Sequence, residues 1–136
     1  MDKFTHFIGI DISKDYFDAT ILLGNIQKHD QFLNTKKGVQ AFLKWIKNEG
    51  CLVDDSLICM EHTGVYKNIL VEVLLAKSCN IWVEMAYRII RSSGIQRGKN
   101  DKVDSARIAL YAKKNQEEAV LFSFSIFIHP RFNIIK

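Results

Sequence analysis

The stretch FIGIDISKDYFDATIL, residues 7–22, predicts two β-strands joined by a tight turn. Residues 7–12 form a short apolar run with a single acid, and residues 17–23 form a second run rich in aromatic and β-branched side chains. Ser13, Lys14 and Asp15 lie between the two runs and have the chemistry of a turn. The sequence therefore predicts a β-hairpin near the N-terminus.

The segments that follow extend this hairpin into a mixed sheet. Gly24 and Asn25 mark a second turn, and the more polar residues 26–33 fit an edge strand or a strand with one wet face. Residues 56–60 form another apolar run that is reached through a helical segment, so we expect it to pair in parallel by a right-handed crossover. Residues 81–85 are a short fifth strand.

Three helices are predicted between and after these strands. Thr35 can cap the first helix, which ends near Gly50 and whose apolar stripe is Val39, Phe42, Leu43 and Ile46. The second helix follows Thr63 and Gly64, and its expected buried side is Ile69, Leu70, Val73 and Leu74. After a basic connector, a last helix has apolar residues at near-helical spacing, namely Val103, Ala106 and Leu110. The predicted order of elements is βββαβαβα, an α/β fold with a mixed five-stranded sheet.

Composition indicates one folded domain. The 136 residues are 48% hydrophobic and 25% charged, which is typical of a protein with a real core. We find no signal-peptide pattern and no apolar run of the roughly 20 residues that a bilayer span needs, so we expect a cytoplasmic protein without membrane contacts. Cys51, Cys59 and Cys79 are predicted to be buried free thiols.

Basic residues gather in the last third of the chain. The formal net charge is +4, and residues 87–114 hold most of the excess, with Asp101 and Asp104 as their only acids. Such a block suits a polyanion such as nucleic acid, although a solvated surface would have the same composition. The residues that we predict to contact nucleic acid are Lys14, Arg88, Arg91, Arg97, Lys99, Lys102 and Arg107.

Four acids occupy the ends of separate elements. Asp11 lies at the end of the first strand, and Glu61 directly follows the fourth. Ligand sites in such sheets lie just beyond the carboxyl ends of the strands, so these two carboxylates are expected to stand side by side. Asp101 and Asp104 are three residues apart at the start of the last helix and can face the same point. Asp101 and Asp104 also have a simpler explanation, because acids are favoured in the first turn of a helix.

A cluster of carboxylates requires a counter-charge. Two carboxylates about 4 Å apart repel by about 4 kcal/mol at an effective dielectric constant of 20. Oxygen ligands alone favour Mg²⁺ or Mn²⁺ over zinc. Two such ions can activate the attacking oxygen and stabilise the leaving oxygen at phosphorus. The acids and the basic block together predict metal-dependent cleavage or transfer of phosphodiesters.

Three separated motifs resemble one known family. FIGIDISKDYFDATIL, MEHTGVYKNILVEVL and KNDKVDSARIALYA occur in this order, and the likeness extends over residues 4–114. They resemble the N-terminal domain of the DEDD-type insertion-sequence transposases, a group that includes the relatives of the Piv invertase and the bridge-RNA-guided recombinases. The resemblance implies an RNase H-like (RuvC-like) domain whose catalytic, metal-binding acids are Asp11, Glu61, Asp101 and Asp104.

The same resemblance implies DNA transposition or recombination as the function. It implies DNA as the partner, a structured guide RNA in some members, and a homo-oligomer such as a dimer or tetramer. It also implies a C-terminal domain that supplies a serine nucleophile, for which this sequence has no counterpart. We therefore expect the RNase H-like domain at residues 1–115 and an atypical tail at residues 116–136.

Two other functions compete with this interpretation. A stand-alone RuvC-like nuclease or junction resolvase would need only the four acids, metal and a nucleic-acid surface. A non-catalytic module that binds nucleic acid or sister subunits would need the basic surface alone. An ATPase of the actin or sugar-kinase kind is disfavoured, because Ile12 and Ser13 replace the Gly-rich phosphate turn and no Walker-type loop occurs.

Overall fold

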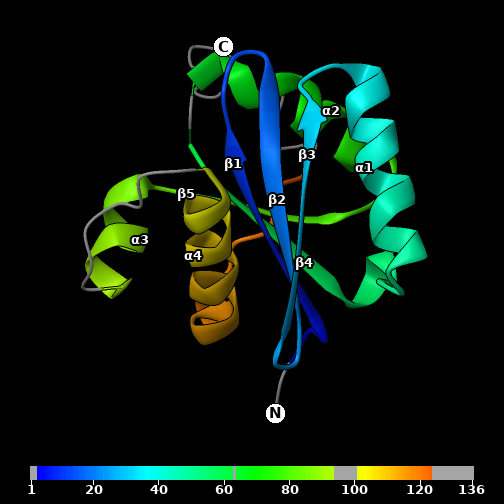
Figure 1. The fold of residues 1–136 in the computed structure, drawn as a ribbon. Coiled ribbons are helices and arrows are strands. Elements are labelled where there is room, and N and C mark those ends of the chain that lie inside the picture. The colour runs from blue at the N-terminus through cyan, green and yellow to red at the C-terminus, as the bar shows by residue number, and fades with distance from the viewer. Residues whose placement is uncertain (1–2, 63, 94–100, 124–136) are drawn as a thin grey trace.

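A computed structural model describes residues 3–62, 64–93 and 101–123, and it describes only the backbone of residues 93 and 101–103 (Figure 1). A single five-stranded sheet has the strand order β3-β2-β1-β4-β5. The strands are β1 (His6–Ile12), β2 (Tyr16–Leu23), β3 (Ile26–Leu33), β4 (Ser56–Glu61) and β5 (Asn80–Glu84). The helices are α1 (Lys36–Asn48), α2 (Asn68–Ala76), α3 (Ala86–Ser93) and α4 (Asp101–Lys114), with short 3₁₀ helices η1 (Val53–Asp55), η2 (Gly64–Lys67) and η3 (Gln116–Glu118).

The sheet combines antiparallel and parallel pairing. β1 pairs antiparallel with β2, and β2 pairs antiparallel with β3. β4 pairs parallel with both β1 and β5, because α1 and α2 carry the chain back between these strands. The predicted mixed five-stranded α/β fold is confirmed, and it agrees with the RNase H-like architecture that the resemblance implied.

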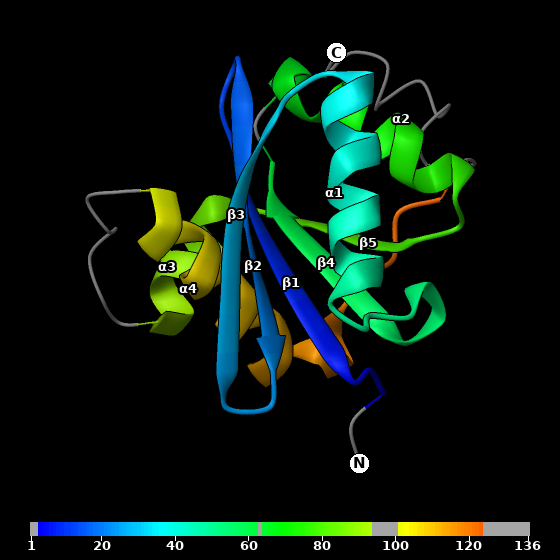
Figure 2. The same cartoon turned by 45° about the vertical axis from the view of Figure 1, so that its right-hand side comes forward.

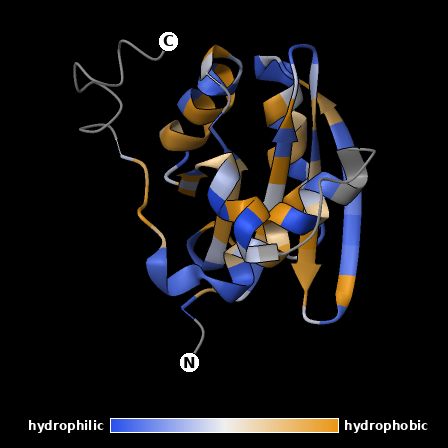
Figure 3. Ribbon diagram, turned by 90° about the vertical axis from the view of Figure 1, so that its left-hand side faces the viewer, coloured by the Kyte–Doolittle hydropathy of each residue, from blue (hydrophilic) through white to orange (hydrophobic). Residues whose placement is uncertain are grey.

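Helices cover both faces of the sheet. α1 and α2 lie on one face and α4 lies on the other, with α3 beside it (Figures 1 and 2). Thr35 accepts a hydrogen bond from the Gly38 amide at 3.0 Å, which confirms the predicted cap of α1. Hydrophilic residues run along most of β3, whereas the inner strands are largely hydrophobic (Figure 3). The polar segment is therefore an edge strand, as predicted.

The buried side of α2 differs from the prediction. Ile69 is 39% exposed, and the buried residues of the helix are Leu70, Val71, Leu74 and Leu75. Almost every residue of this helix is apolar, so hydrophobic periodicity alone cannot select one face. Packing against the sheet decides which of these apolar residues are buried.

The structure also corrects the prediction for the last two helices. α3 occupies the first part of the predicted basic connector, and residues 94–100 of the connector lie outside the described residues. Ile89 of α3 is buried in the core on the α4 side. In α4, Leu110 is 44% exposed and Ala106 is half-buried, while the side chain of Val103 lies outside the described part of the chain. The buried residues of this helix are Ser105, Ile108, Ala109, Tyr111 and Ala112. Small residues, Ser105 and Ala109, lie where α4 packs most closely against β1, so residue hydrophobicity does not mark this part of the face.

Gly9 in β1 makes this close packing possible. A Cβ atom at Gly9 would overlap the backbone of Ser105 and Ala109 in α4. One strand away, the hydroxyl groups of Thr20 and Ser105 form a buried hydrogen bond of 2.7 Å. Gly9 and this hydrogen bond together fix the position of α4 over β1 and β2.

The segment after α4 packs against the same domain. The Gln116 side chain accepts a hydrogen bond from the Lys3 amide at 2.9 Å, and the Phe122 amide donates one to the Ile81 carbonyl at 2.7 Å. Phe122 is buried in the core beneath α1 and α2. The three cysteines are buried free thiols, as predicted. None of the helices in the described ranges has the length and apolar character to cross a membrane.

Gly9→Ala should destabilise the protein by about 1–3 kcal/mol, because the added methyl group must push α4 away from β1. Urea unfolding measures this change. Gly24→Asn is the control, since the space around Gly24 is open and asparagine tolerates its positive φ of 62°. A loss of stability no larger for Gly9→Ala than for Gly24→Asn would contradict the close-packing argument.

Candidate metal centre and nucleic-acid interface

Asp11 and Glu61 stand at neighbouring strand ends. The register of β1 and β4 aligns Ile10 with Met60, and each acid is the next residue along its strand. Ile10 and Met60 point into the core beneath α1 and α2. Because side chains alternate along a strand, Asp11 and Glu61 point to the opposite face, which α4 covers. Asp11 is half-buried and Glu61 is buried.

The structure adds two acids that the sequence analysis missed. Asp18 of β2 pairs directly with Asp11, and Glu84 of β5 pairs directly with Glu61. Both lie on the α4 face, since the residues beside them, such as Phe17 and Ala19, point into the opposite core. We call Asp18, Asp11, Glu61 and Glu84 the acidic row, since they follow one another across four adjacent strands. A single acid in each apolar run was the signal that could have revealed it.

Asp18 has polar partners on the edge strand. It is 4% exposed, and its Oδ1 atom lies 3.3 Å from Nε2 of His29. The Gln31 side-chain amide donates to both carboxylate oxygens of Asp18 at 3.3 Å. The burial of this carboxylate is therefore offset by partners from β3.

Glu84 is held at the other end of the row. The Tyr111 hydroxyl donates to its Oε2 atom at 2.7 Å, and the Met85 amide donates to its Oε1 atom at 2.9 Å. Nε of Arg88, one helical turn along the chain, lies 3.9 Å from Oε1. Burial raises the pKa of Cys59 on the same face of β4, and the charges of Glu84 and Glu61 raise it further. Both glutamates are therefore close enough to Cys59 to affect its pKa.

The first turn of α4 lies at the same end of the sheet. α4 runs antiparallel to β1, so its N-terminus is close to the carboxyl end of that strand (Figure 1). Asp104 is half-buried, and its Oδ1 atom lies 3.9 Å from Nη1 of Arg107. The side chain of Asp101 lies outside the described part of the chain. It therefore stays a prediction that Asp101 and Asp104 lie close to Asp11 and Glu61.

The donor set fits a hard cation. The inner acids, Asp11 and Glu61, lie on adjacent strands, and carboxylate oxygens are the type of ligand that Mg²⁺ and Mn²⁺ prefer. The outer acids, Asp18 and Glu84, already have polar partners and are suited to hold the edges of the site. Among the described side chains, no three of His, Cys, Asp and Glu form a complete metal-binding group.

The turn after Glu61 is fixed by buried polar contacts. Lys67 is 3% exposed, and its Nζ atom donates to the Gly64 carbonyl at 3.0 Å. Burial lowers the pKa of Lys67, and burial together with the charge of Lys67 lowers the pKa of His62. Asn34 donates to the carbonyls of Ser13 and Tyr66 at 3.1 and 2.9 Å, and so links the β1–β2 turn to this loop. These hydrogen bonds hold the β1–β2 turn and η2 in place next to the inner acids.

The predicted nucleic-acid residues differ in their surroundings. Lys14 is exposed in the β1–β2 turn, close to the end of β1, and Arg88 and Arg91 are exposed on α3. Arg107 is largely buried and faces Asp104 within α4. Arg97 and Lys99 lie outside the described part of the chain, and so does the side chain of Lys102. The contact of all these residues with nucleic acid stays a prediction.

Comparisons with known proteins identify the family of this chain. A family model described as transposase, DEDD_Tnp_IS110, matches residues 8–123. The chain is 29% identical over 111 residues to the pilin gene-inverting proteins of Moraxella bovis and Moraxella lacunata. These matches cover 79% of the chain and 34% of each relative, so the chain spans about a third of the length of the curated relatives it matches. The family match covers most of the sheet and all of α4, and the chain therefore belongs to the DEDD transposase family.

Proposed function

We propose that this chain is the metal-binding catalytic part of a transposase or site-specific recombinase, and that it supports cleavage and transfer of DNA strands. The observation that carries this proposal is the placement of Asp11 and Glu61 at adjacent strand ends, on the face that α4 covers. The relatives that are named for inverting a pilin gene favour recombination over other phosphodiester chemistry.

In this proposal, Asp11, Glu61, Asp101 and Asp104 hold Mg²⁺ or Mn²⁺. Bound there, the ions would supply Lewis acidity to the attacking and leaving oxygens of a phosphodiester. Asp18 and Glu84 keep the outer ends of the row in place through His29 and Tyr111. Lys14 and the arginines of α3 bind the backbone phosphates next to the acids.

The remaining parts of the reaction belong to a larger assembly in this proposal. The family resemblance implies a serine nucleophile from a further domain, a homo-oligomer that holds two DNA partners, and in some members a guide RNA.

A second candidate function is a nucleic-acid-binding module that uses no metal. The observation that favours it is that the described side chains form no complete metal-binding group and that the outer acids already have partners. Metal binding by the isolated protein separates the two functions.

Asp11→Asn and Glu61→Gln should each weaken Mn²⁺ binding by at least about tenfold, because each removes a direct ligand and even outer-shell changes have effects of this size. Isothermal titration calorimetry measures the affinity. Wild-type protein should also gain about 2.7 kcal/mol of stability at a metal concentration 100 times Kd. Glu72→Gln, an exposed change on α2, is the matched control. Equal Mn²⁺ affinity in all four proteins would refute the proposed metal site.

Nicking of supercoiled DNA tests whether the isolated chain can cleave a DNA strand by itself. We expect no metal-dependent nicking by the wild-type chain alone, because the proposed serine nucleophile lies in another domain. Agarose electrophoresis after incubation with Mn²⁺ measures this. Nicking by the wild type that disappears in Asp11→Asn would instead establish a stand-alone nuclease of the same fold.

DNA affinity should fall steeply with salt, and Lys14→Ala should reduce the slope of log K against log salt by about 0.9, the value for one phosphate contact on duplex DNA. Fluorescence anisotropy at several salt concentrations gives this slope. Lys77→Ala removes an exposed lysine that lies just before β5, at the opposite end of the strands, and should leave the slope unchanged. Identical slopes for the two variants would remove Lys14 from the interface.

A further inference from the structure

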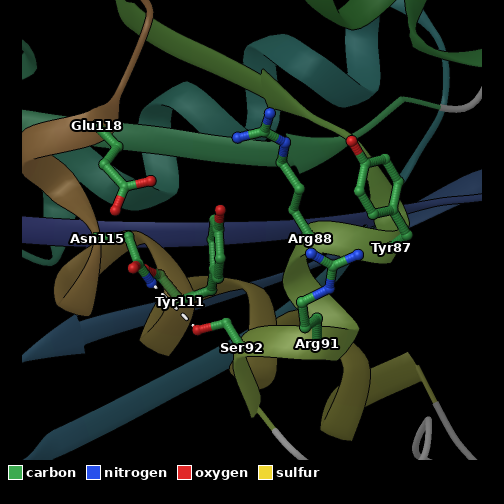
Figure 4. Close-up of a pocket in the computed structure, with 7 residues that line it drawn as sticks. All are labelled: Tyr87, Arg88, Arg91, Ser92, Tyr111, Asn115 and Glu118. Atoms are coloured by element: carbon green, nitrogen blue, oxygen red, sulfur yellow. Dashed lines mark hydrogen bonds between the residues drawn. The ribbon is translucent and has the colours of Figure 1, made fainter.

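A cavity of about 310 Å³ opens between α3 and α4, outside the acidic row (Figure 4). Tyr87, Arg88 and Arg91 of α3 lie on one side of it. Tyr111 and Asn115 of α4 lie on the other side. This volume is at the low end of the range for small-molecule sites, roughly 300–1,000 Å³.

The α3 side of the cavity combines an aromatic ring with two cations. Tyr87 is 52% exposed, so much of its ring remains available for contact. The guanidinium carbon atoms of Arg91 and Arg88 lie 5.6 and 6.0 Å from the centre of this ring. Aromatic rings on which bases stack, together with positive charge that follows the backbone, are the usual means of binding single-stranded nucleic acid.

The α4 side supplies groups that can hydrogen-bond with a base edge. Asn115 of α4 donates a hydrogen bond of 3.4 Å to the hydroxyl group of Ser92 on α3, and both residues line the cavity. Glu118 of η3 adds a carboxylate that can accept a hydrogen bond from an exocyclic amine. The lining is therefore cationic and aromatic on one side and polar on the other.

A smaller cleft of about 30 Å³ continues this cavity. Arg107 and Lys114 line the cleft, and Ser92 and Tyr111 line both cavities. Basic side chains thus follow the contact between α3 and α4 from one cavity to the next.

The cavity is also connected to the acidic row. The Tyr111 hydroxyl donates to Glu84 at 2.7 Å, and Arg88 approaches the same carboxylate at 3.9 Å. Glu84 pairs across the sheet with Glu61, one of the inner acids. A group bound between α3 and α4 would therefore lie beside the proposed metal centre.

We propose that this cavity binds one unpaired nucleotide of a DNA strand, with its base against Tyr87 and its phosphate against Arg91 and Arg88. A base pair within a duplex cannot enter a cavity of this volume, whereas one nucleotide at a strand end or flipped out of the helix can. The inference rests on the proposed function, since it names the part of the DNA substrate that this domain holds next to the acids.

Binding of short DNA in EDTA tests the proposal without metal. Tyr87→Ala should weaken binding of a single-stranded oligonucleotide by about tenfold, the loss expected for one stacked base. The same variant should change the affinity for a blunt duplex hairpin by less than about twofold, because paired bases cannot reach the ring. Fluorescence anisotropy measures both affinities.

Matched variants identify stacking as the cause. Tyr87→Phe keeps the ring and should retain the affinity for the single strand, whereas Arg91→Ala should lower it. Lys44→Ala removes a lysine from α1 on the other face of the sheet and should have no effect. Circular dichroism checks that each variant is folded.

A readout on unmutated protein completes the test. A single strand that carries 2-aminopurine should lose fluorescence on binding to the wild type, because the base becomes stacked on Tyr87. Equal losses of single-strand and duplex affinity in Tyr87→Ala, or an unchanged 2-aminopurine signal, would overturn the proposal and leave α3 as a duplex-backbone contact. Because no metal is present, either result is independent of the Mn²⁺ measurements that test the proposed function.

Discussion

The close contact between α4 and β1 is the constraint on which the rest of the structure depends. The backbone of α4 passes over Gly9 at a distance that leaves no space for a Cβ atom. Thr20 and Ser105 add a buried hydrogen bond at the same level of the sheet. α4 is therefore held with its first turn at the carboxyl end of β1, where Asp11 and Glu61 emerge. If α4 were packed more loosely, the position of its first turn relative to Asp11 and Glu61 would not be fixed.

Strand register produces the second important feature, the acidic row. A shift of one residue in any pairing would turn an acid into the core beneath α1 and α2, where a charge without a partner is very unfavourable. The outer acids are stabilised in two different ways, by His29 and Gln31 on β3 and by Tyr111 and Arg88 on the helices. The inner pair lies between these fixed ends. This division explains how four carboxylates can share one face, and it suits the proposed metal site at the centre.

The two helices after β5 connect the row to a basic surface. Arg88 reaches back to Glu84, while Arg91 and Tyr87 line the cavity between α3 and α4. Tyr111 belongs to both regions, since it lines the cavity and donates to Glu84. Binding of a DNA strand and positioning of the acids would therefore depend on the same packing of α3 and α4.

The sequence by itself determined the type and order of most elements, because strands of alternating or continuous apolar residues and a capped helix are local patterns. It also predicted that Asp11 and Glu61 would be neighbours, since both lie at the ends of strands that pair in parallel. Only the tertiary structure decided the faces of α2 and α4 and the existence of α3. α2 is apolar almost all round, and α4 packs closest to the sheet through the small residues Ser105 and Ala109, so neither face has a distinctive local pattern. α3 spans only Ala86–Ser93, and a helix this short depends on packing, here on the burial of Ile89. The positions of Asp18 and Glu84 in the acidic row could not be predicted from the sequence for a similar reason. They depend on strand register and on contacts with His29 and Tyr111, which are properties of the folded domain and not of any single segment.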